Sequence, residues 1–444
     1  MIYNLLRILL WIPLKVVMIL RPKKRIFIEK RLNQNFDFLK SEKPYIWLHC
    51  SSVGEINLSD ALIKKLLAER KEDILISIFT DTGYETAQNK YSKEERIKLI
   101  YFPLDCKNEI RKILKRIDLK LLILIETEIW PNLISCAKKK GKVILVNGRI
   151  SDKSFGRYMK LKRILKNVLG KIDHFYMQTP LDGERIETIG ADSSKVSVVG
   201  NLKFDIELQN YSEDEKNELK DIIKAEGRKI FVAGSTRTGE DEIILDAFKH
   251  LRGYMLVLVP RHLDRIEKIE DLLRKRRISF SKYSDCLEEK ADKTQVVIVD
   301  QMGVLRKFYS ICDSAFVGGT LVNIGGHSLL EPLFYRKTPI FGKYLQNVKD
   351  IADEILKRGI GFKVDNGEDI AVSIGEIDNG HIKNEEIENF FKDNQNVAQK
   401  IINEINKLVW KNLKPCIEKI FVIYAVSWTP KNDMFEGKAR VYHF

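Results

Sequence analysis

The sequence predicts an α/β protein built from two doubly wound domains with a cleft between them. Two observations predict this class: short apolar runs alternate with helical stretches, and this rhythm stops at residue 207 and restarts at residue 229. The chain has 444 residues, of which 44% are hydrophobic, and a domain usually takes about 100–200 residues. Length and composition therefore favour two folded domains and exclude a mostly disordered chain.

Residues 26–206 carry the pattern of the first domain. Strands are expected at 45–50, 74–80, 97–102, 119–126, 142–147, 175–179 and 195–200, with helices at 59–70 and 109–117 among the connections. The runs are apolar throughout rather than alternating with polar residues, which is typical of parallel strands buried on both faces. We therefore expect a parallel sheet covered by helices.

Residues 229–412 repeat the pattern as a second domain. Strands are expected at 230–235, 255–260, 296–300, 314–319 and 338–342, and residues 384–411 read as one or two amphipathic helices. The polar segment 207–228 is expected to be a linker, and residues 413–444 form a tail without assignment. In such sheets ligands bind beyond the carboxyl ends of the strands, so the loops there hold the candidate site residues.

Residues 1–25 are expected to be a membrane-associating helix. The first twenty residues are mostly apolar, but Arg7, Pro13 and Lys15 interrupt them, whereas a membrane span needs about 20 consecutive apolar residues. The polar residues gather on one side of a helix, and six cations follow within 21–31, which is typical of a helix lying in the interface of an acidic membrane. A core helix and a single span remain alternatives. No small-residue cleavage site follows, so we expect the segment to be retained.

Charge and composition narrow the class of partner. Lys and Arg number 76 against 62 Asp and Glu, so the net charge of +14 favours an anionic partner. The six cysteines show no C-x-x-C pair and the seven histidines no H-E-x-x-H pattern, so we expect neither a metal nor another cofactor. Basic tracts interleaved with aromatic residues are missing from the sequence, so nucleic acid is not an expected partner.

Carboxylates follow two of the first-domain strands. Glu55 lies in the loop HCSSVGEINLSDA at 49–61, where it reads either as a helix cap or as a general base in the cleft. Glu126 and Glu128 lie in ETEIWPN at 126–132, and they face the same side if Glu126 still belongs to the strand. The alternative for Glu128 is a cap of the helix that follows Pro131.

Basic and hydroxyl residues follow two further strands of the first domain. Residues 147–158 combine Arg149 and Arg157 with serines, a set that suits an acidic sugar or a phosphate. Lys203, in GNLKFD at 200–205, lies beside the expected crossover between the domains, although a lone lysine is usually a solvated surface group.

Three loops of the second domain suit an anion. GSTRTGEDE at 234–242 is a turn that leads into a helix, and Arg261 follows the strand at 255–260. GGTLVNIGGHSLLEP at 318–332 places two glycine pairs before a helix that holds Glu331, a residue suited to accept ribose hydroxyls. The chain has neither a G-x-x-x-x-G-K-[ST] loop nor a G-x-G-x-x-G turn, which argues against an ATPase and a dehydrogenase.

Eight blocks, in this order and spacing, resemble the 3-deoxy-D-manno-octulosonic acid (Kdo) transferases of lipopolysaccharide assembly. The blocks are SSVGE (51–55), ETEIWPN (126–132), NGRIS (147–151), GNLKFD (200–205), STRTGEDE (235–242), PRH (260–262), MG (302–303) and FVGGTLVNIGGHSLLEP (316–332). The resemblance covers about residues 1–410. It implies an inverting GT-B glycosyltransferase that moves Kdo from CMP-Kdo to a lipid A precursor, lipid IVA, at the cytoplasmic side of the inner membrane and releases CMP.

The resemblance also implies roles for individual residues. Glu55 matches the catalytic base, and Glu126 and Lys203 match positions that stabilise the transition state. The positions that match CMP-binding residues are Pro260, Arg261, Met302, Gly303, Val304, Ser328, Leu329, Leu330 and Glu331.

The chain departs from the family pattern at three places in the donor-binding blocks. The family usually has Glu where this chain has Val304, Asn-Pro where it has Ser328 and Leu329, and His where it has Arg237. These departures concern the cytidine contacts more than the reaction. The alternatives are another GT-B nucleotide-sugar enzyme and a basic peripheral membrane-binding protein without catalysis.

Overall fold

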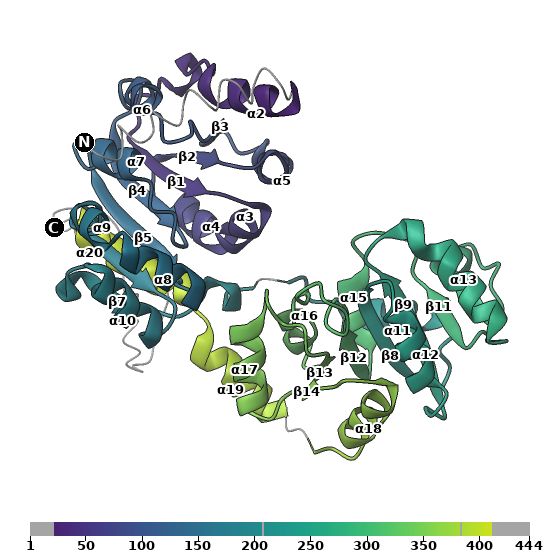
Figure 1. Ribbon diagram of the computed structural model, residues 1–444. Helices are drawn as coiled ribbons and strands as arrows, with labels where there is room; N and C mark the ends of the chain where they lie inside the picture. The colour runs from purple at the N-terminus through teal and green to yellow at the C-terminus, as the bar shows by residue number, and fades with distance from the viewer. Residues whose placement is uncertain (1–21, 207, 382–383, 411–444) are drawn as a thin grey trace, which may run out of the picture.

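Two seven-stranded parallel sheets, each covered by helices on both faces, make up the computed structural model (Figure 1). The structure describes residues 22–206, 208–381 and 384–410. The helix expected over residues 1–20 and the tail 413–444 therefore lie outside the described residues. None of the described helices has the length and apolar character of a membrane span.

The first sheet has the strand order β3-β2-β1-β4-β5-β6-β7. Its strands are β1 (Tyr45–Cys50), β2 (Asp73–Ile78), β3 (Ile97–Tyr101), β4 (Leu119–Ile125), β5 (Lys142–Gly148), β6 (His174–Met177) and β7 (Val196–Val198). Its helices are α2 (Pro22–Leu32), α3 (Val53–Leu58), α4 (Asp60–Glu69), α5 (Asp81–Tyr91), α6 (Lys107–Leu114), α7 (Pro131–Ala137), α8 (Asp152–Lys160), α9 (Lys162–Leu169) and α10 (Pro180–Ile189). The expected strands are confirmed within a few residues, because continuous apolar runs leave little freedom in their placement.

The second sheet has the order β10-β11-β9-β8-β12-β13-β14. Its strands are β8 (Lys229–Thr236), β9 (Tyr254–Pro260), β10 (Phe280–Lys282), β11 (Val296–Ile298), β12 (Ser314–Val317), β13 (Pro339–Phe341) and β14 (Phe362–Lys363). Its helices are α11 (Glu213–Ile222), α12 (Asp241–Phe248), α13 (Ile266–Lys275), α14 (Tyr283–Leu287), α15 (Leu305–Ile311), α16 (Leu330–Phe334), α17 (Lys349–Lys357), α18 (Gly367–Asp378) and α19 (Asn384–Asn394). The sequence did not predict β10 and β14, because edge strands of two or three residues carry too short a pattern.

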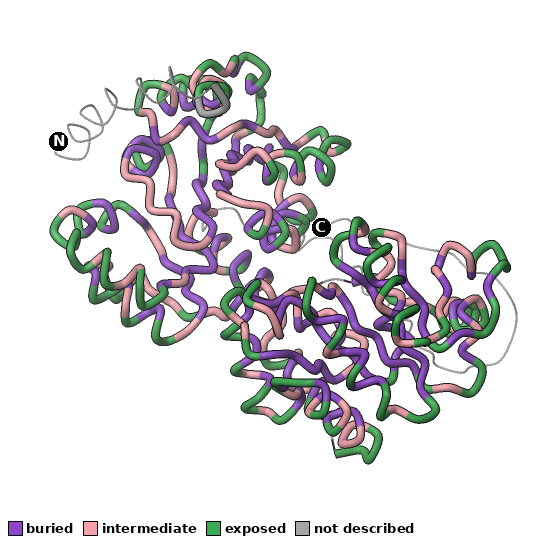
Figure 2. The backbone as a smooth tube through the Cα atoms, turned by 45° about the vertical axis from the view of Figure 1, so that its right-hand side comes forward, coloured by how far each residue is buried: buried purple, intermediate pink, exposed green. Residues whose placement is uncertain are grey.

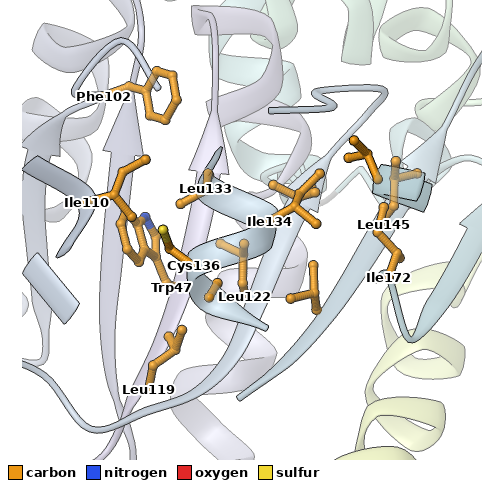
Figure 3. Packing of buried hydrophobic residues seen from close by; sticks show 14 of the residues in the cluster. Trp47, Phe102, Ile110, Leu119, Leu122, Leu133, Ile134, Cys136, Leu145 and Ile172 are labelled. Carbon is orange, nitrogen blue, oxygen red and sulfur yellow. The ribbon is translucent and has the colours of Figure 1, made fainter. Parts of the chain in front are cut away.

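Each sheet is packed on both faces by apolar side chains. Figure 3 shows one face of the first sheet, where Trp47 lies among residues of α6 and α7 such as Ile110 and Leu133. The Trp47 indole N–H donates to Ser77 Oγ at 2.9 Å, so its polar atom is satisfied within the core. Buried backbone runs through the centre of both domains and exposed residues lie on the outer helices (Figure 2).

Two segments depart from the expected domain division. The expected linker 207–228 contains α11, whose Leu219 packs with Ile223 in the core of the second domain. Because the segment is mostly charged, its sequence did not reveal Leu219 and Ile223 as a buried face. The two residues are one helical turn apart. The last described helix, α20 (Val397–Val409), packs against the first domain rather than the second (Figure 1), and the Asp205 carboxylate accepts from the backbone N–H groups at its start.

The order of the strands in each sheet determines which loops lie next to one another. In the first sheet β1 lies between β2 and β4, and in the second sheet β8 lies between β9 and β12. The loops that follow β1 and β4 therefore leave the same edge side by side, and so do those that follow β8 and β12. Such switch points are where doubly wound sheets bind ligands.

Candidate active site

Glu55 lies in the first turn of α3, directly after β1. Ser52 caps the helix, and the Glu55 carboxylate accepts from the Ser51 backbone N–H at 2.6 Å and from the Ser52 hydroxyl at 3.3 Å. The residue is only 7% exposed. Burial raises its pKa to about 8, although the Ser51 N–H opposes the shift, and the charges of Glu128 and Glu126 raise it further. A carboxylate with so high a pKa is a stronger base than an ordinary glutamate.

Glu126 lies one residue beyond the end of β4. Its backbone is left-handed, with φ of 56°, so it leaves the strand and the alternation expected for Glu126 and Glu128 does not apply. Burial raises the pKa of Glu126, and the positive charges of Lys203 and Arg149 oppose this shift. The structure thus brings the predicted Glu126 and Lys203 into one electrostatic group.

Glu128 does not cap the helix that follows it. Trp130 holds the cap position of α7 without a side-chain hydrogen bond, and its indole N–H donates instead to Glu128 Oε2 at 2.7 Å. The imidazole Nε2 of His49 lies 3.7 Å from the same oxygen. The sequence analysis missed His49, since a histidine inside an apolar strand shows no motif.

Lys203 is placed by two buried asparagines. Asn147 Oδ1 accepts from the Leu202 N–H at 2.8 Å, and Asn201 Oδ1 accepts from the Lys203 N–H at 3.0 Å. Lys203 lines a cavity of about 650 Å³ between the domains. The other side of this cavity is lined by His327, Ser328 and Glu331 of the second domain. The cavity therefore joins predicted residues of both domains.

A second cavity, of about 440 Å³, lies at the carboxyl edge of the second sheet. Six of the predicted donor-binding residues line it: Pro260, Arg261, Met302, Gly303, Ser328 and Glu331. Leu329 is fully buried in the core, so its side chain is out of reach of a ligand in this cavity. Leu330 is buried beside the interdomain cavity, and Val304 caps α15 without lining either cavity.

Arginines and histidines gather beside this donor cavity. The Arg237 guanidinium donates to His327 Nε2 at 3.3 Å and lies 2.6 Å from His262 Nε2. Burial, together with the charges of Arg237 and Arg261, lowers the pKa of His327 to about 4, so this ring is neutral at physiological pH. Arg237 and Arg261 place positive charge beside the cavity, which suits a phosphate or carboxylate.

Glu331 is already paired in this structure. Arg306 donates to Glu331 Oε1 through Nε at 3.2 Å and Nη2 at 3.0 Å. The sequence analysis missed Arg306, which lies in the first turn of α15 and lines both cavities.

The glycine-rich loop after β12 is held from within the protein. The buried Glu240 accepts from the backbone N–H groups of Gly319, Thr320 and Leu321 at 2.8–3.0 Å. A Cβ on Gly318 would lie 2.4 Å from the Ser235 carbonyl, and Gly319 has φ of 72°. Gly318 therefore serves the packing of the loop against β8. Glu240 was also missed, because an acidic residue before a helix reads as an ordinary cap.

The described residues contain no group of three or more histidine, cysteine or carboxylate side chains placed to bind a metal ion. The first domain provides the buried carboxylate of Glu55, whose pKa is raised, and Lys203, whose charge acts on Glu126. Across the interdomain cavity, the second domain provides a cavity lined by arginines. These are the parts needed to deprotonate a hydroxyl and to receive an anionic leaving group.

Comparisons with known proteins agree with this arrangement. Residues 28–206 match the family model described as 3-deoxy-D-manno-octulosonic-acid transferase (kdotransferase). The chain is 35% identical over 312 residues to a 3-deoxy-D-manno-octulosonic acid transferase of Haemophilus influenzae, covering 69% of this chain and 72% of the relative.

A longer relative and a solved structure add to these matches. A bifunctional glycosyltransferase/methyltransferase of Fusobacterium nucleatum is 55% identical over 418 residues, which are 93% of this chain and 64% of that protein. The chain thus spans less than two thirds of that relative. The crystal structure of a UDP-N-acetylglucosamine 2-epimerase shares the fold, with a TM-score of 0.56, 11% identity and coverage of 84% of this chain and 98% of that one.

Proposed function

The chain belongs to the Kdo transferase family and has its two-domain GT-B fold, and from this premise we propose that it transfers Kdo from CMP-Kdo to the lipid A precursor lipid IVA. CMP is the second product. The observation that carries the proposal is the interdomain cavity. On the first domain it is lined by Lys203 and by Gly54, the residue before Glu55, and on the second domain by His327, Ser328 and Glu331. A donor held by the second domain and an acceptor held by the first meet there.

Glu55 is the proposed catalytic base. Its ionised carboxylate takes the proton of an acceptor hydroxyl, whose oxygen bonds to the anomeric carbon of Kdo as the bond from that carbon to the CMP phosphate breaks. The electron pair leaves with CMP. Attack opposite the leaving group inverts the anomeric carbon, and the raised pKa of Glu55 makes it an effective proton acceptor.

The charged groups around the reacting atoms supply electrostatic stabilisation. Arg261 lines the donor cavity and Arg237 lies beside it, so these guanidinium groups offset the charge that develops on the departing phosphate. Lys203 and Glu126, on the first domain, form the charge pair that faces the sugar in the proposed transition state. Glu331 and Ser328 remain the candidates for contacts with the ribose.

We also propose that the first domain works at an acidic membrane surface, on the cytoplasmic side of the inner membrane. Helix α8 follows β5 at the carboxyl edge of the first sheet and has no buried residue. Met159, Leu161 and Leu181 are exposed in or near it, with 36%, 50% and 52% of their surfaces accessible. Lys153, Arg157, Lys160, Lys162 and Arg163 are exposed around them. Apolar residues ringed by cations suit lipid headgroups and acyl chains.

Nucleotide binding tests the donor. CMP should raise the melting temperature of the purified protein, whereas UDP at the same concentration should not. Protection by UDP alone would favour another nucleotide-sugar enzyme of the GT-B class. Salt-dependent lipid binding without nucleotide protection or turnover would favour a peripheral membrane protein without catalysis.

A further inference from the structure

One ion pair joins the two domains within the described residues. Arg149, directly after β5 in the first domain, places Nη2 at 3.0 Å from Oδ2 of Asp350 in the first turn of α17 of the second domain. The side chains are 33% and 44% exposed. The pair therefore lies at the boundary of the domains, partly open to solvent.

Both ends of this pair are held by rigid parts of their own domains. The Arg149 backbone is tied to Thr127, whose hydroxyl donates to the Arg149 carbonyl and accepts from the Arg149 N–H at 3.2 Å. Helix α17 is anchored in the core of the second domain through Ile351, Ala352 and Ile355. The separation of the two charges consequently depends on how the domains are placed.

Arg149 also acts on a proposed catalytic group. Its positive charge lowers the pKa of Glu126, the carboxylate that follows β4, and thereby opposes the effect of burial. Thr127, which ties the Arg149 backbone, is the residue next to Glu126. One guanidinium thus forms an ion pair with a carboxylate of the second domain and acts electrostatically on a carboxylate of the first.

We propose that Asp350 is a positioning residue, which orients the Arg149 guanidinium beside Glu126 and so makes the catalytic electrostatics of the first domain depend on the placement of the second. The inference rests on the proposed transfer reaction. Asp350 touches neither cavity, so it acts through Arg149. When the domains separate, the ion pair with Asp350 breaks, and the Arg149 guanidinium is no longer held in one orientation.

The test compares Asp350→Asn with a matched control on the same helix. Asp353 is exposed and forms no ion pair among the described residues, so Asp353→Asn should leave turnover unchanged. Asp350→Asn should lower kcat about 1.5- to 5-fold, the range that corresponds to a partly exposed pair, without changing the affinity for CMP. Asp350→Glu should restore most of the rate.

A double-mutant cycle isolates the route through Arg149. In an Arg149→Gln background, Asp350→Asn should cause no further loss of kcat, because the partner is already gone. An unchanged kcat for Asp350→Asn, an equal loss for Asp353→Asn, or a persistent loss in the Arg149→Gln background would each overturn the proposal.

Solution scattering separates this inference from the proposed reaction. Asp350→Asn should give a larger radius of gyration than the wild-type protein, whereas Asp353→Asn should not. If the wild-type protein transfers no Kdo, the proposed function fails and scattering alone decides whether the pair fixes the domains. Identical scattering of Asp350→Asn and wild type overturns the interdomain role whatever the substrate is.

Discussion

Glu128 Oε2 lies 3.7 Å from Nε2 of His49, a fully buried histidine of β1. Burial alone would raise the pKa of Glu128, but His49 and the hydrogen bond from Trp130 lower it overall. At nearby Glu55 burial outweighs the hydrogen bonds from Ser51 and Ser52, and the pKa rises. Two neighbouring carboxylates are thus pushed in opposite directions, which is a pattern of sites that divide acid and base roles.

The pH dependence of the reaction should report Glu55. Because only the ionised carboxylate accepts a proton, kcat/KM should rise with pH and level off above an apparent pKa of about 8. Initial rates at acceptor concentrations well below KM, measured from pH 6 to about 9.5, check this. A rate that is flat over this range would show that a group other than Glu55 limits proton transfer.

Glu55→Gln should make the protein more stable at alkaline pH. The pKa of Glu55 is raised in the folded state, so its contribution to stability is present below the unfolded pKa and is lost as pH rises through about 8. The neutral amide avoids this loss. The melting temperature of the variant should therefore exceed that of wild type by several degrees at pH 9, with little difference at pH 4. An equal shift at both pH values would point to packing instead.

Glu240→Gln should weaken donor binding through the glycine-rich loop. A neutral amide offers one oxygen in place of the two that now accept from Gly319, Thr320 and Leu321. Leaving buried N–H groups without a partner costs about 1–3 kcal/mol. We expect a lower melting temperature and weaker CMP binding by calorimetry. The control is Glu242→Gln, since Glu242 is exposed in the first turn of α12, which Glu240 precedes. An equal effect of both substitutions would refute the role of Glu240.

Arg261→Gln should weaken CMP binding about 10- to 150-fold, since a charge-assisted contact to phosphate contributes about 1.5–3 kcal/mol. Arg261 lines the donor cavity, whereas Arg252 is exposed elsewhere in the second domain. Arg252→Gln is therefore the matched control in the same calorimetric titration. Unchanged affinity in Arg261→Gln would place the phosphate elsewhere.

Charge reversal on the surface around α8 should reduce membrane binding. Lys160→Glu with Arg163→Glu removes two cations, each contributing about 1 kcal/mol near an acidic surface, so sedimentation with vesicles containing anionic phospholipid should weaken at least tenfold. Lys268→Glu with Lys275→Glu on α13 of the second domain makes the same charge change as a control. Equal weakening by both pairs would mean that net charge, and no particular face, drives binding.

The sequence predicted the parts of the site that depend on position along a strand. Glu55, Glu126 and Arg261 follow buried apolar runs, and parallel strands bring such positions to one edge. It could not predict His49 or Glu240, because their importance lies in contacts with residues distant in sequence. The order of the strands, which makes the loops after β1 and β4 neighbours, likewise appears only in the folded sheet.

The boundary between the domains also could not be predicted from the sequence. Leu219 of α11 and Ile223, which caps its end, pack in the core of the second domain, yet the sequence of the helix is mostly charged. Helix α20 looks like a continuation of the second domain until its packing against the first is seen. Amphipathic patterns show that a face is buried, but not against which partner.

The most direct test of the central claim is Kdo transfer by the wild-type protein and Glu55→Gln, with Glu85→Gln as a surface control. Each protein is incubated with CMP-Kdo and lipid IVA, and the lipid is analysed by mass spectrometry. We expect wild type and Glu85→Gln to yield lipid heavier by one or more Kdo units. Glu55→Gln, folded by its melting curve, should be at least ~100-fold slower. Wild-type turnover that persists in Glu55→Gln would contradict the assignment of the base, and no transfer by folded wild type would contradict the reaction itself.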